Sequence, residues 1–274
     1  MKTKPFSLYV IYGCLLIFGF VPFLLVAVTS FLSNDPNNLV TLPFTFDNYI
    51  ELFTPLFGKV FLRSVLISLI TTIGCLVIAY PFSYFLVRSK HQSILLLLII
   101  IPFWTSSLIR TYSLIAILKF KGLLNLFLLK LHIIDQPLSL LYTNFAVISG
   151  LIYNLFPFMV LPIFTNMERF DFRLFEAAKD LGAGKLDLFF KIFLPNTARG
   201  IISGCVLVFL PAMTLFYIPN VLGGARSILI GNMIQSQFLV IENWPQGAAT
   251  SMILTALLLV LLFIFKRKGN EGRS

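Results

Sequence analysis

Residues 145–167 read FAVISGLIYNLFPFMVLPIFTNM, and none of these side chains is charged. A helix needs about 20 mostly apolar residues to cross the roughly 30 Å hydrocarbon core of a bilayer. This stretch therefore predicts a membrane-spanning helix. The whole chain has the same character, because 58% of its 274 residues are hydrophobic and only 12% are charged. Such a composition excludes a water-soluble globular protein and a disordered chain.

Five further stretches of low charge are long enough to span a membrane, and together they predict an all-α integral membrane protein. The six predicted spans are 7–32, 64–87, 92–118, 145–167, 200–218 and 248–265. The first is longer than the apolar core of a signal peptide, so we expect it to be retained. Residues 227–241 are uncharged but short for a span, which favours a re-entrant or surface segment on the outer side.

Lysine and arginine predict the orientation of the chain, because they collect in cytoplasmic loops. One set of segments holds Lys2, Lys4, Arg88, Lys90, Arg169, Arg173, Lys179, Lys185, Lys191, Arg199, Lys266, Arg267, Lys268 and Arg273. The opposite set holds the smaller group Lys59, Arg63, Arg110, Lys119, Lys121, Lys130 and Arg226. We therefore expect both termini to be cytoplasmic, and the net charge of +10 needs no nucleic acid to explain it.

Residues suited to catalysis or metal binding are scarce. The cysteines lie far apart and the two histidines are isolated, so no metal site is expected. No Asp or Glu lies inside a predicted span, which argues against an intramembrane enzyme and an ion-coupled secondary transporter. Gly182-Ala183-Gly184-Lys185 is followed by Leu186 where a phosphate-binding loop needs Ser or Thr. We therefore expect no catalytic residue and no bound cofactor in this chain.

Charges return at high density in the predicted cytoplasmic loop 168–199. Asp171 is a plausible N-cap, helical spacing continues to Leu181, and Gly182 supplies a stop. A second short helix is expected to begin near Lys185 and to be closed by Pro195. Helices this short need a surface to bind, which is either the bilayer interface or a protein partner.

The spacing of this loop resembles a known family motif. Glu176-Ala177-Ala178, three residues, Gly182, nine residues and then Ile192-Phe193-Leu194-Pro195 resembles the EAA loop of permease subunits of bacterial ABC importers. The resemblance implies a type I importer permease with a coupling helix that docks on a cytosolic ATPase. The residues that it assigns to ATPase coupling are Glu176, Ala177, Ala178, Leu181, Gly182, Ile192 and Pro195.

The same resemblance implies the partners and the cell compartment. The partners would be a second permease subunit in a heterodimer, two copies of an ABC ATPase that binds ATP and Mg²⁺, and an extracytoplasmic binding protein. The compartment would be the bacterial inner membrane. Residues 102–110 (PFWTSSLIR), 210–213 (LPAM), 216–217 (FY) and 244–249 (WPQGAA) further resemble the first permease subunit of spermidine/putrescine importers. The expected substrates are therefore polyamines, with sugar, sulfate or molybdate as the alternative for the same machine.

A polyamine is a multivalent cation, so its path needs carboxylates or aromatic faces. Because the spans lack acids, we expect aromatic faces from this chain, with Trp104, Tyr112 and Tyr217 as the candidates. Arg110 would repel a cation, so gating or contact with the binding protein is its expected role. Glu242 and Trp244, just before the last span, are candidates for the same contact.

Overall fold

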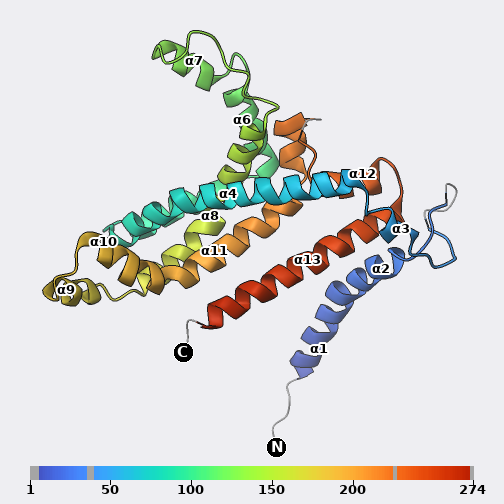
Figure 1. The fold of residues 1–274 in the computed structure, drawn as a ribbon, viewed down its shortest axis with the longest axis horizontal. Coiled ribbons are helices and arrows are strands. Elements are labelled where there is room, and N and C mark those ends of the chain that lie inside the picture. Colours follow the sequence, from blue (N-terminus) through green and yellow to red (C-terminus); the bar gives the residue numbers. More distant parts are fainter. Residues whose placement is uncertain (1–5, 36–39, 225–226, 272–274) are drawn as a thin grey trace, which may run out of the picture. The chain divides into compact units, whose positions relative to one another are not determined.

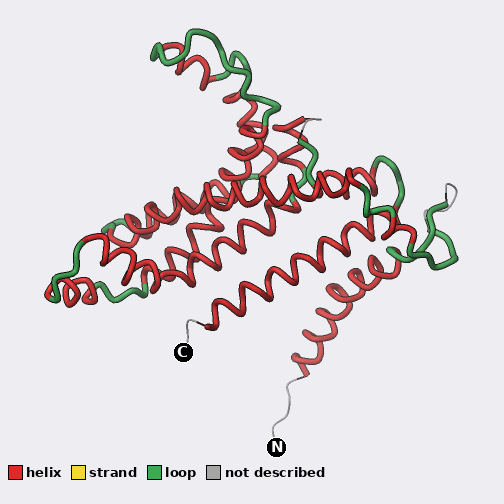
Figure 2. The backbone as a smooth tube through the Cα atoms, in the orientation of Figure 1, coloured by secondary structure: helices red, strands yellow, loops and turns green. Residues whose placement is uncertain are grey.

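The computed structural model describes residues 6–35, 40–224 and 227–271. Lys2, Lys4, Arg226 and Arg273, which were used to predict the orientation, lie outside these residues. The named elements of the described chain are all helices, and its one isolated β-bridge joins Ser33 and Thr41 (Figures 1 and 2). An all-α protein is therefore confirmed.

Most helices follow one another closely along the chain, with longer connections between α2 and α3 and between α7 and α8. In the first half they are α1 (Phe6–Leu15), the π-helix η1 (Leu16–Phe20), α2 (Val21–Thr29), α3 (Asp47–Ile50), α4 (Pro55–Arg88), α5 (Gln92–Ile100), the 3-10 helix η2 (Ile101–Trp104), α6 (Ser107–Leu118) and α7 (Leu123–Lys130). In the second half they are α8 (Asn144–Glu168), α9 (Arg173–Asp180), α10 (Lys185–Asp187), the π-helix η3 (Leu188–Phe193), α11 (Leu194–Thr214), the π-helix η4 (Pro219–Gly223), α12 (Ile230–Leu239) and α13 (Trp244–Glu271).

Six helical segments of the described chain are long and apolar enough to cross a membrane. They are Ile11–Thr29, Pro55–Arg88, Ser107–Lys130, Asn144–Glu168, Lys185–Thr214 and Trp244–Phe263. All six overlap the predicted spans, although their ends differ. The fifth begins earlier than residue 200 and ends at Thr214, because Leu215 takes an extended conformation with ψ of 118°. The uncharged segment 227–241 contains only the ten-residue helix α12.

The third span departs from the prediction. A single helix over 92–118 is wrong, because α5 gives way to the 3-10 helix η2 and the chain is then extended at Thr105 and Ser106 before α6 begins. Pro102 lies in η2 and cannot donate a backbone hydrogen bond, which favours a break here. The apolar helix Gln92–Trp104 is too short to count as a span, and the third candidate begins at Ser107.

The prediction that Pro195 closes a short helix is also wrong. The chain is helical without interruption from Lys185 to Thr214, and Pro195 lies in the first turn of α11. A proline ring inside a helix clashes with the carbonyl four residues earlier. The π-helix η3 ends at Phe193, two residues before Pro195, and its wider turn gives the proline ring room. The same arrangement recurs where η1 precedes Pro22 at the start of α2.

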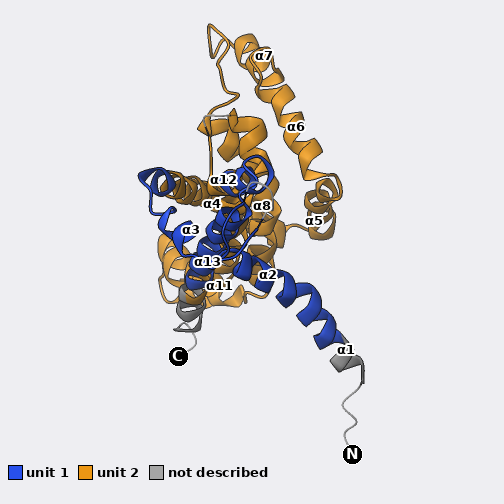
Figure 3. Ribbon diagram, turned by 90° about the vertical axis from the view of Figure 1, so that its right-hand side faces the viewer, with its two compact units in different colours: residues 1–59, 233–261 blue, residues 60–232, 262–274 orange. Residues whose placement is uncertain are grey.

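The chain divides into two compact units, which Figure 3 colours separately: residues 1–59 with 233–261, and residues 60–232 with 262–274. In the second unit, α8 packs along α11. Gly200 and Gly204 of α11 allow this close approach. A Cβ atom added at Gly200 would lie 2.9 Å from the Pro162 carbonyl oxygen and 3.1 Å from the Ile163 Cα. Small residues four apart are a common solution for helix pairs in membranes.

The first unit is held by polar contacts around the start of α13. The Gln246 side chain donates to the Glu51 carboxylate at 3.3 Å, and the Thr250 hydroxyl donates to the Gln237 side-chain oxygen at 2.9 Å. Near the end of α2, the Asn48 side chain donates to the carbonyl oxygens of Ser30 and Leu32. These contacts satisfy polar groups that are buried next to apolar helices.

Candidate functional site

The loop between α8 and α11 folds into one short helix, a glycine corner and the start of a long helix. Helix α9 begins at Arg173, and the Asp171 carboxylate accepts a hydrogen bond from the Arg173 N–H at 3.0 Å. Gly182 ends it with a φ of +83°. The Gly182 N–H donates to the Lys179 carbonyl at 2.8 Å and the Ala183 N–H donates to the Ala178 carbonyl at 3.0 Å. This pair of bonds is a Schellman motif, so the helical stop predicted at Gly182 is confirmed.

Four phenylalanines hold α9 against the bundle, and we call them the aromatic anchor: Phe170, Phe172, Phe175 and Phe193. The Phe193 ring lies 5.2 Å from the Phe170 ring at an interplanar angle of 87°, and 5.7 Å from the Phe175 ring at 61°. The Phe193 side chain is only 2% exposed. Aromatic pairs in such geometry each contribute about 0.5 to 1.5 kcal/mol beyond the area that they bury. The loop is therefore a fixed part of its unit.

Helix α4 contributes to the same anchor. The Tyr84 ring lies 5.4 Å from Phe193, and the Arg88 guanidinium carbon lies 4.9 Å from the Tyr84 ring and 5.1 Å from the Phe172 ring. The Tyr80 hydroxyl is 2.9 Å from the Thr197 hydroxyl of α11. As a result α4, α9 and α11 meet at the end of the bundle where α8 finishes (Figure 1).

The outer face of α9 carries apolar side chains without a partner in the described chain. Leu174 is 45% exposed, Leu181 is 89% exposed, and Ala177 between them is also exposed. Residues three and seven apart share one helix face. Glu176 is exposed beside them, and Leu186 just past the corner is 74% exposed. Ala178 lies on the inner side with Phe175 and is partly buried.

The remaining coupling candidates lie on the long helix. Ile192 is partly buried in η3, and Pro195 is exposed at the start of α11. Ile192 directly precedes Phe193 of the aromatic anchor and Pro195 follows it by two residues, so the two candidates flank that ring in sequence. The structure therefore places the coupling candidates on two elements joined at Gly182, rather than on two separate short helices.

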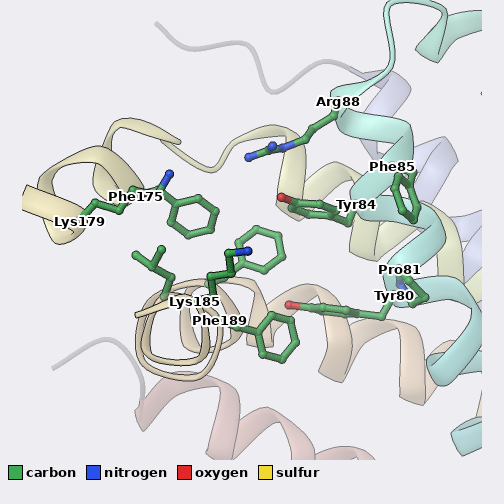
Figure 4. Close-up of a pocket in the computed structure, with 11 residues that line it drawn as sticks. Tyr80, Pro81, Tyr84, Phe85, Arg88, Phe175, Lys179, Lys185 and Phe189 are labelled. Carbon is green, nitrogen blue, oxygen red and sulfur yellow. The ribbon is translucent and has the colours of Figure 1, made fainter. Parts of the chain in front are cut away.

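A cavity of about 630 Å³ opens between α4, α9 and η3. Figure 4 shows the tips of Arg88, Lys179 and Lys185 and the hydroxyls of Tyr80 and Tyr84 facing its interior. Its other walls are apolar and come from the aromatic anchor, the end of α4, and Leu188 and Phe189 of η3. The sequence analysis did not single out this cavity.

Arg110 is nearly buried in α6, at 9% exposure. Its guanidinium carbon lies 4.6 Å from the Phe103 ring and 6.0 Å from the Tyr153 ring, and its Nε has no hydrogen-bond partner within the described residues. Cation–π contact with two rings therefore holds this charge without a carboxylate. Its role in gating or binding-protein contact stays a prediction.

The three aromatic path candidates are not brought together. Trp104 is 86% exposed at the end of η2, and Tyr112 is 59% exposed on α6. Tyr217 follows α11, is partly buried and packs against the hydrophobic core of its unit, with its ring 6.3 Å from Phe216. Within the part of the chain that the structure describes, no ring contact joins the three. Their role in a substrate path stays a prediction.

Glu242 and Trp244 lie in the other compact unit, at the start of α13. Glu242 is exposed and has a φ of +57°. The Trp244 ring lies 5.9 Å from Phe238, and Trp244 is 39% exposed. The Asn243 side-chain oxygen accepts a hydrogen bond from the Gln246 N–H at 3.1 Å, which caps the helix. Both candidate side chains are thus accessible on their own unit.

The architecture and the helical loop are those of a permease subunit of an ABC importer. Residues 62–267 match the model of the family described as binding-protein-dependent transport system inner membrane component. The chain belongs to this family, and it is a multi-pass protein of the inner membrane.

Individual relatives within this family show which transport systems the chain is similar to in sequence. The chain is 49% identical over 262 residues to the spermidine/putrescine transport system permease protein PotB of Escherichia coli (strain K12), with 95% of each chain covered. It is 45% identical over 271 residues to PotB of Haemophilus influenzae, with 98% of this chain and 95% of the relative covered. The family recognised from the sequence is therefore confirmed.

A solved structure confirms the fold. The chain superposes with a TM-score of 0.77 and 15% identity on a chain of a bacterial alginate ABC transporter in complex with an alginate pentasaccharide-bound periplasmic protein. The superposition covers 97% of this chain and 93% of the other. At this identity the likeness establishes the type I permease fold and nothing about the substrate.

Proposed function

We propose that this chain is a membrane-spanning subunit of an ATP-driven importer that moves spermidine and putrescine into a bacterial cell. An extracytoplasmic binding protein delivers the polyamine, and a separate cytosolic subunit hydrolyses ATP. The observation that carries the proposal is the 49% identity to a spermidine/putrescine permease over 95% of both chains.

The outer face of α9 is the surface offered to the ATPase. Leu174, Ala177 and Leu181 form an apolar stripe, and exposed charges such as Glu176 border it. An apolar centre with a polar rim is the usual composition of a protein interface. Two ATPase copies bind ATP and Mg²⁺, a second permease subunit completes the pore, and this chain binds no cofactor. Both termini then lie in the cytoplasm.

The aromatic candidates supply cation–π contacts to the polyamine. Trp104 and Tyr112 are exposed on their unit and Tyr217 is partly so. Each contact is worth roughly 0.5 to 2 kcal/mol, which guides a cation and binds it weakly enough to release it. The carboxylates that recognise the charge in the membrane come mainly from the second permease subunit. Arg110, Glu242 and Trp244 act in gating or in contact with the binding protein.

The test is reconstitution of the chain with the neighbouring-gene subunits in proteoliposomes. We expect uptake of labelled spermidine that requires ATP and the binding protein. Unlabelled putrescine should compete, whereas maltose, sulfate and molybdate should not. Competition by one of these three solutes and not by putrescine would assign the other substrate class. Uptake that persists without ATP and stops when an ion gradient is collapsed would reject an ABC importer.

A further inference from the structure

Three cations from three elements face the cavity between α4, α9 and η3. Arg88 is the last residue of α4, Lys179 lies on α9, and Lys185 begins α10. Figure 4 shows their nitrogen atoms turned toward the same space. Within the described residues, the ion pair that the structure holds joins Asp187 and Lys191 at 2.6 Å, and it involves none of the three. No carboxylate of the described chain lies within ion-pair distance of these three cations, so the cavity concentrates positive charge.

The floor of the cavity continues into the exposed apolar face of α4. Pro81 and Phe85 line the cavity. Ile78 and Val77 lie three and four residues before Pro81, so they share its face of α4. Phe85 is 70% exposed, Val77 is 66% exposed and Ile78 is 51% exposed. Helix α4 is long and apolar enough to span the membrane, so an apolar stripe that runs along it toward the cations is suited to contact with hydrocarbon.

The cavity is separate from the face of α9 assigned to the ATPase. Phe175 and Lys179, four residues apart, line the cavity. Leu174, Ala177 and Leu181 share a different face, more than 100° around the helix. A ligand in the cavity and a protein on the outer face can therefore be bound together.

We propose that this cavity binds the headgroup of an anionic phospholipid of the cytoplasmic leaflet, with an acyl chain along the apolar stripe of α4. The phosphate accepts charge-assisted hydrogen bonds from Arg88, Lys179 and Lys185. Basic pockets between spanning helices on the cytoplasmic side are suited to such lipids, and a volume of about 630 Å³ is in the range of ligand sites. The proposal rests on the proposed function only for the orientation of the chain.

A lipid in this position joins the end of α4 to both sides of the glycine corner. It contacts Arg88 on one side and Lys179 and Lys185 on the other, so it adds to the aromatic anchor in fixing α9. Anionic lipid is thereby a structural ligand of the loop that couples to the ATPase.

The test uses the full importer in nanodiscs of phosphatidylcholine with a minor share of phosphatidylglycerol, and native mass spectrometry counts the phosphatidylglycerol retained. The test variant carries Arg88→Gln, Lys179→Gln and Lys185→Gln. The matched control carries Lys119→Gln, Lys121→Gln and Lys130→Gln, exposed lysines of the α6–α7 region. Each basic residue near a membrane contributes about fivefold, so we expect retention about 100-fold lower in the test variant and unchanged in the control.

Further arms separate lipid from the other occupants. Phe85→Ser removes apolar wall without changing charge, so it should weaken phosphatidylglycerol retention, and inorganic phosphate alone should not displace the lipid. Equal retention in the test and control variants would overturn the proposal. Displacement by inorganic phosphate, or loss of the ATPase with lipid retained, would instead assign the cavity to a free anion or a protein. Because retention is measured without transport, the result is independent of which solute the importer carries.

Discussion

The glycine corner allows a prediction whose size follows from the backbone. Gly182 has a φ of +83°, and a Cβ atom added there would meet nothing within 4 Å. The cost of Gly182→Ala is therefore backbone strain alone, about 1 to 2 kcal/mol for an L-residue in a left-handed conformation. Gly184 provides the matched control. Its φ of −72° and ψ of 167° suit any residue, and an added Cβ would meet only the Asp187 carboxylate, at 3.8 Å.

The strain acts locally. Helix α9 has eight residues, which is too short to be stable alone, so the corner opens before the membrane helices do. A cost of 1 to 2 kcal/mol changes an equilibrium by about 5- to 30-fold. Spermidine uptake per ATP hydrolysed is expected to fall by up to that factor in Gly182→Ala and to stay at the wild-type value in Gly184→Ala. Gly182→Asn should fall between them, because Asn tolerates positive φ.

The assay measures labelled spermidine uptake and phosphate release in the same proteoliposomes, after the amount of inserted permease has been equalised. A bulkier residue at position 182 should uncouple ATPase activity from uptake while the protein still reaches the membrane. Equal uptake per ATP in the two alanine variants, at equal insertion, would refute a coupling role for the corner. A parallel loss in both variants would show that the loop tolerates no side chain, and would refute the backbone argument.

Three further outcomes are expected. Glu176→Lys places a cation on the outer face of α9 and should reduce the ATPase that copurifies with the permease; an unchanged yield would count against docking there. Gly200→Ala forces a Cβ against the backbone at Pro162, so the melting temperature should fall by the equivalent of about 1 to 3 kcal/mol, whereas Ser203→Ala on the exposed side should leave it unchanged. Trp104→Ala should reduce uptake several-fold at equal assembly, and wild-type kinetics would remove Trp104 from the substrate path.

Long uncharged stretches made most of the fold predictable from the sequence. A run such as 145–167 has one low-energy conformation in a bilayer, because every backbone N–H and C=O must be satisfied within the helix. Helix α8 accordingly occupies Asn144–Glu168. The stop at Gly182 was predictable for a similar local reason, since glycine readily takes the left-handed conformation that ends a helix.

The two wrong predictions about helix ends concern prolines, because a proline can either break a helix or be accommodated within it. Pro102 coincides with a break, whereas Pro195 lies inside a continuous helix because η3 widens the turn before it. The sequence shows the same feature in both cases, a proline within or next to an apolar stretch. Tertiary packing decides whether the helix breaks there or continues. The buried Phe193 is one such packing partner at η3.

The aromatic anchor and the cavity escaped the sequence analysis for a different reason. Phe170, Phe172 and Phe175 stand close together in the loop, but their contact partner Phe193 and the cation Arg88 lie on other elements. These residues form a fixed cluster only through contacts with residues that are distant in the sequence. The feature of the sequence that could have indicated this cluster is the high number of aromatic residues in a loop that is otherwise highly charged.

The aromatic anchor also determines how movement of α9 would reach the membrane. Phe193 contacts the loop through Phe170 and Phe175, contacts α4 through Tyr84, and continues directly into α11. A displacement of α9 by an ATPase would therefore act on two spanning helices through packed rings, as a rigid-body movement. Ring packing is far less sensitive to ionic strength than exposed ion pairs are. Within the permease, coupling should consequently resist salt, so any salt dependence of transport would arise at the charged rim of the docking surface or at the polyamine itself.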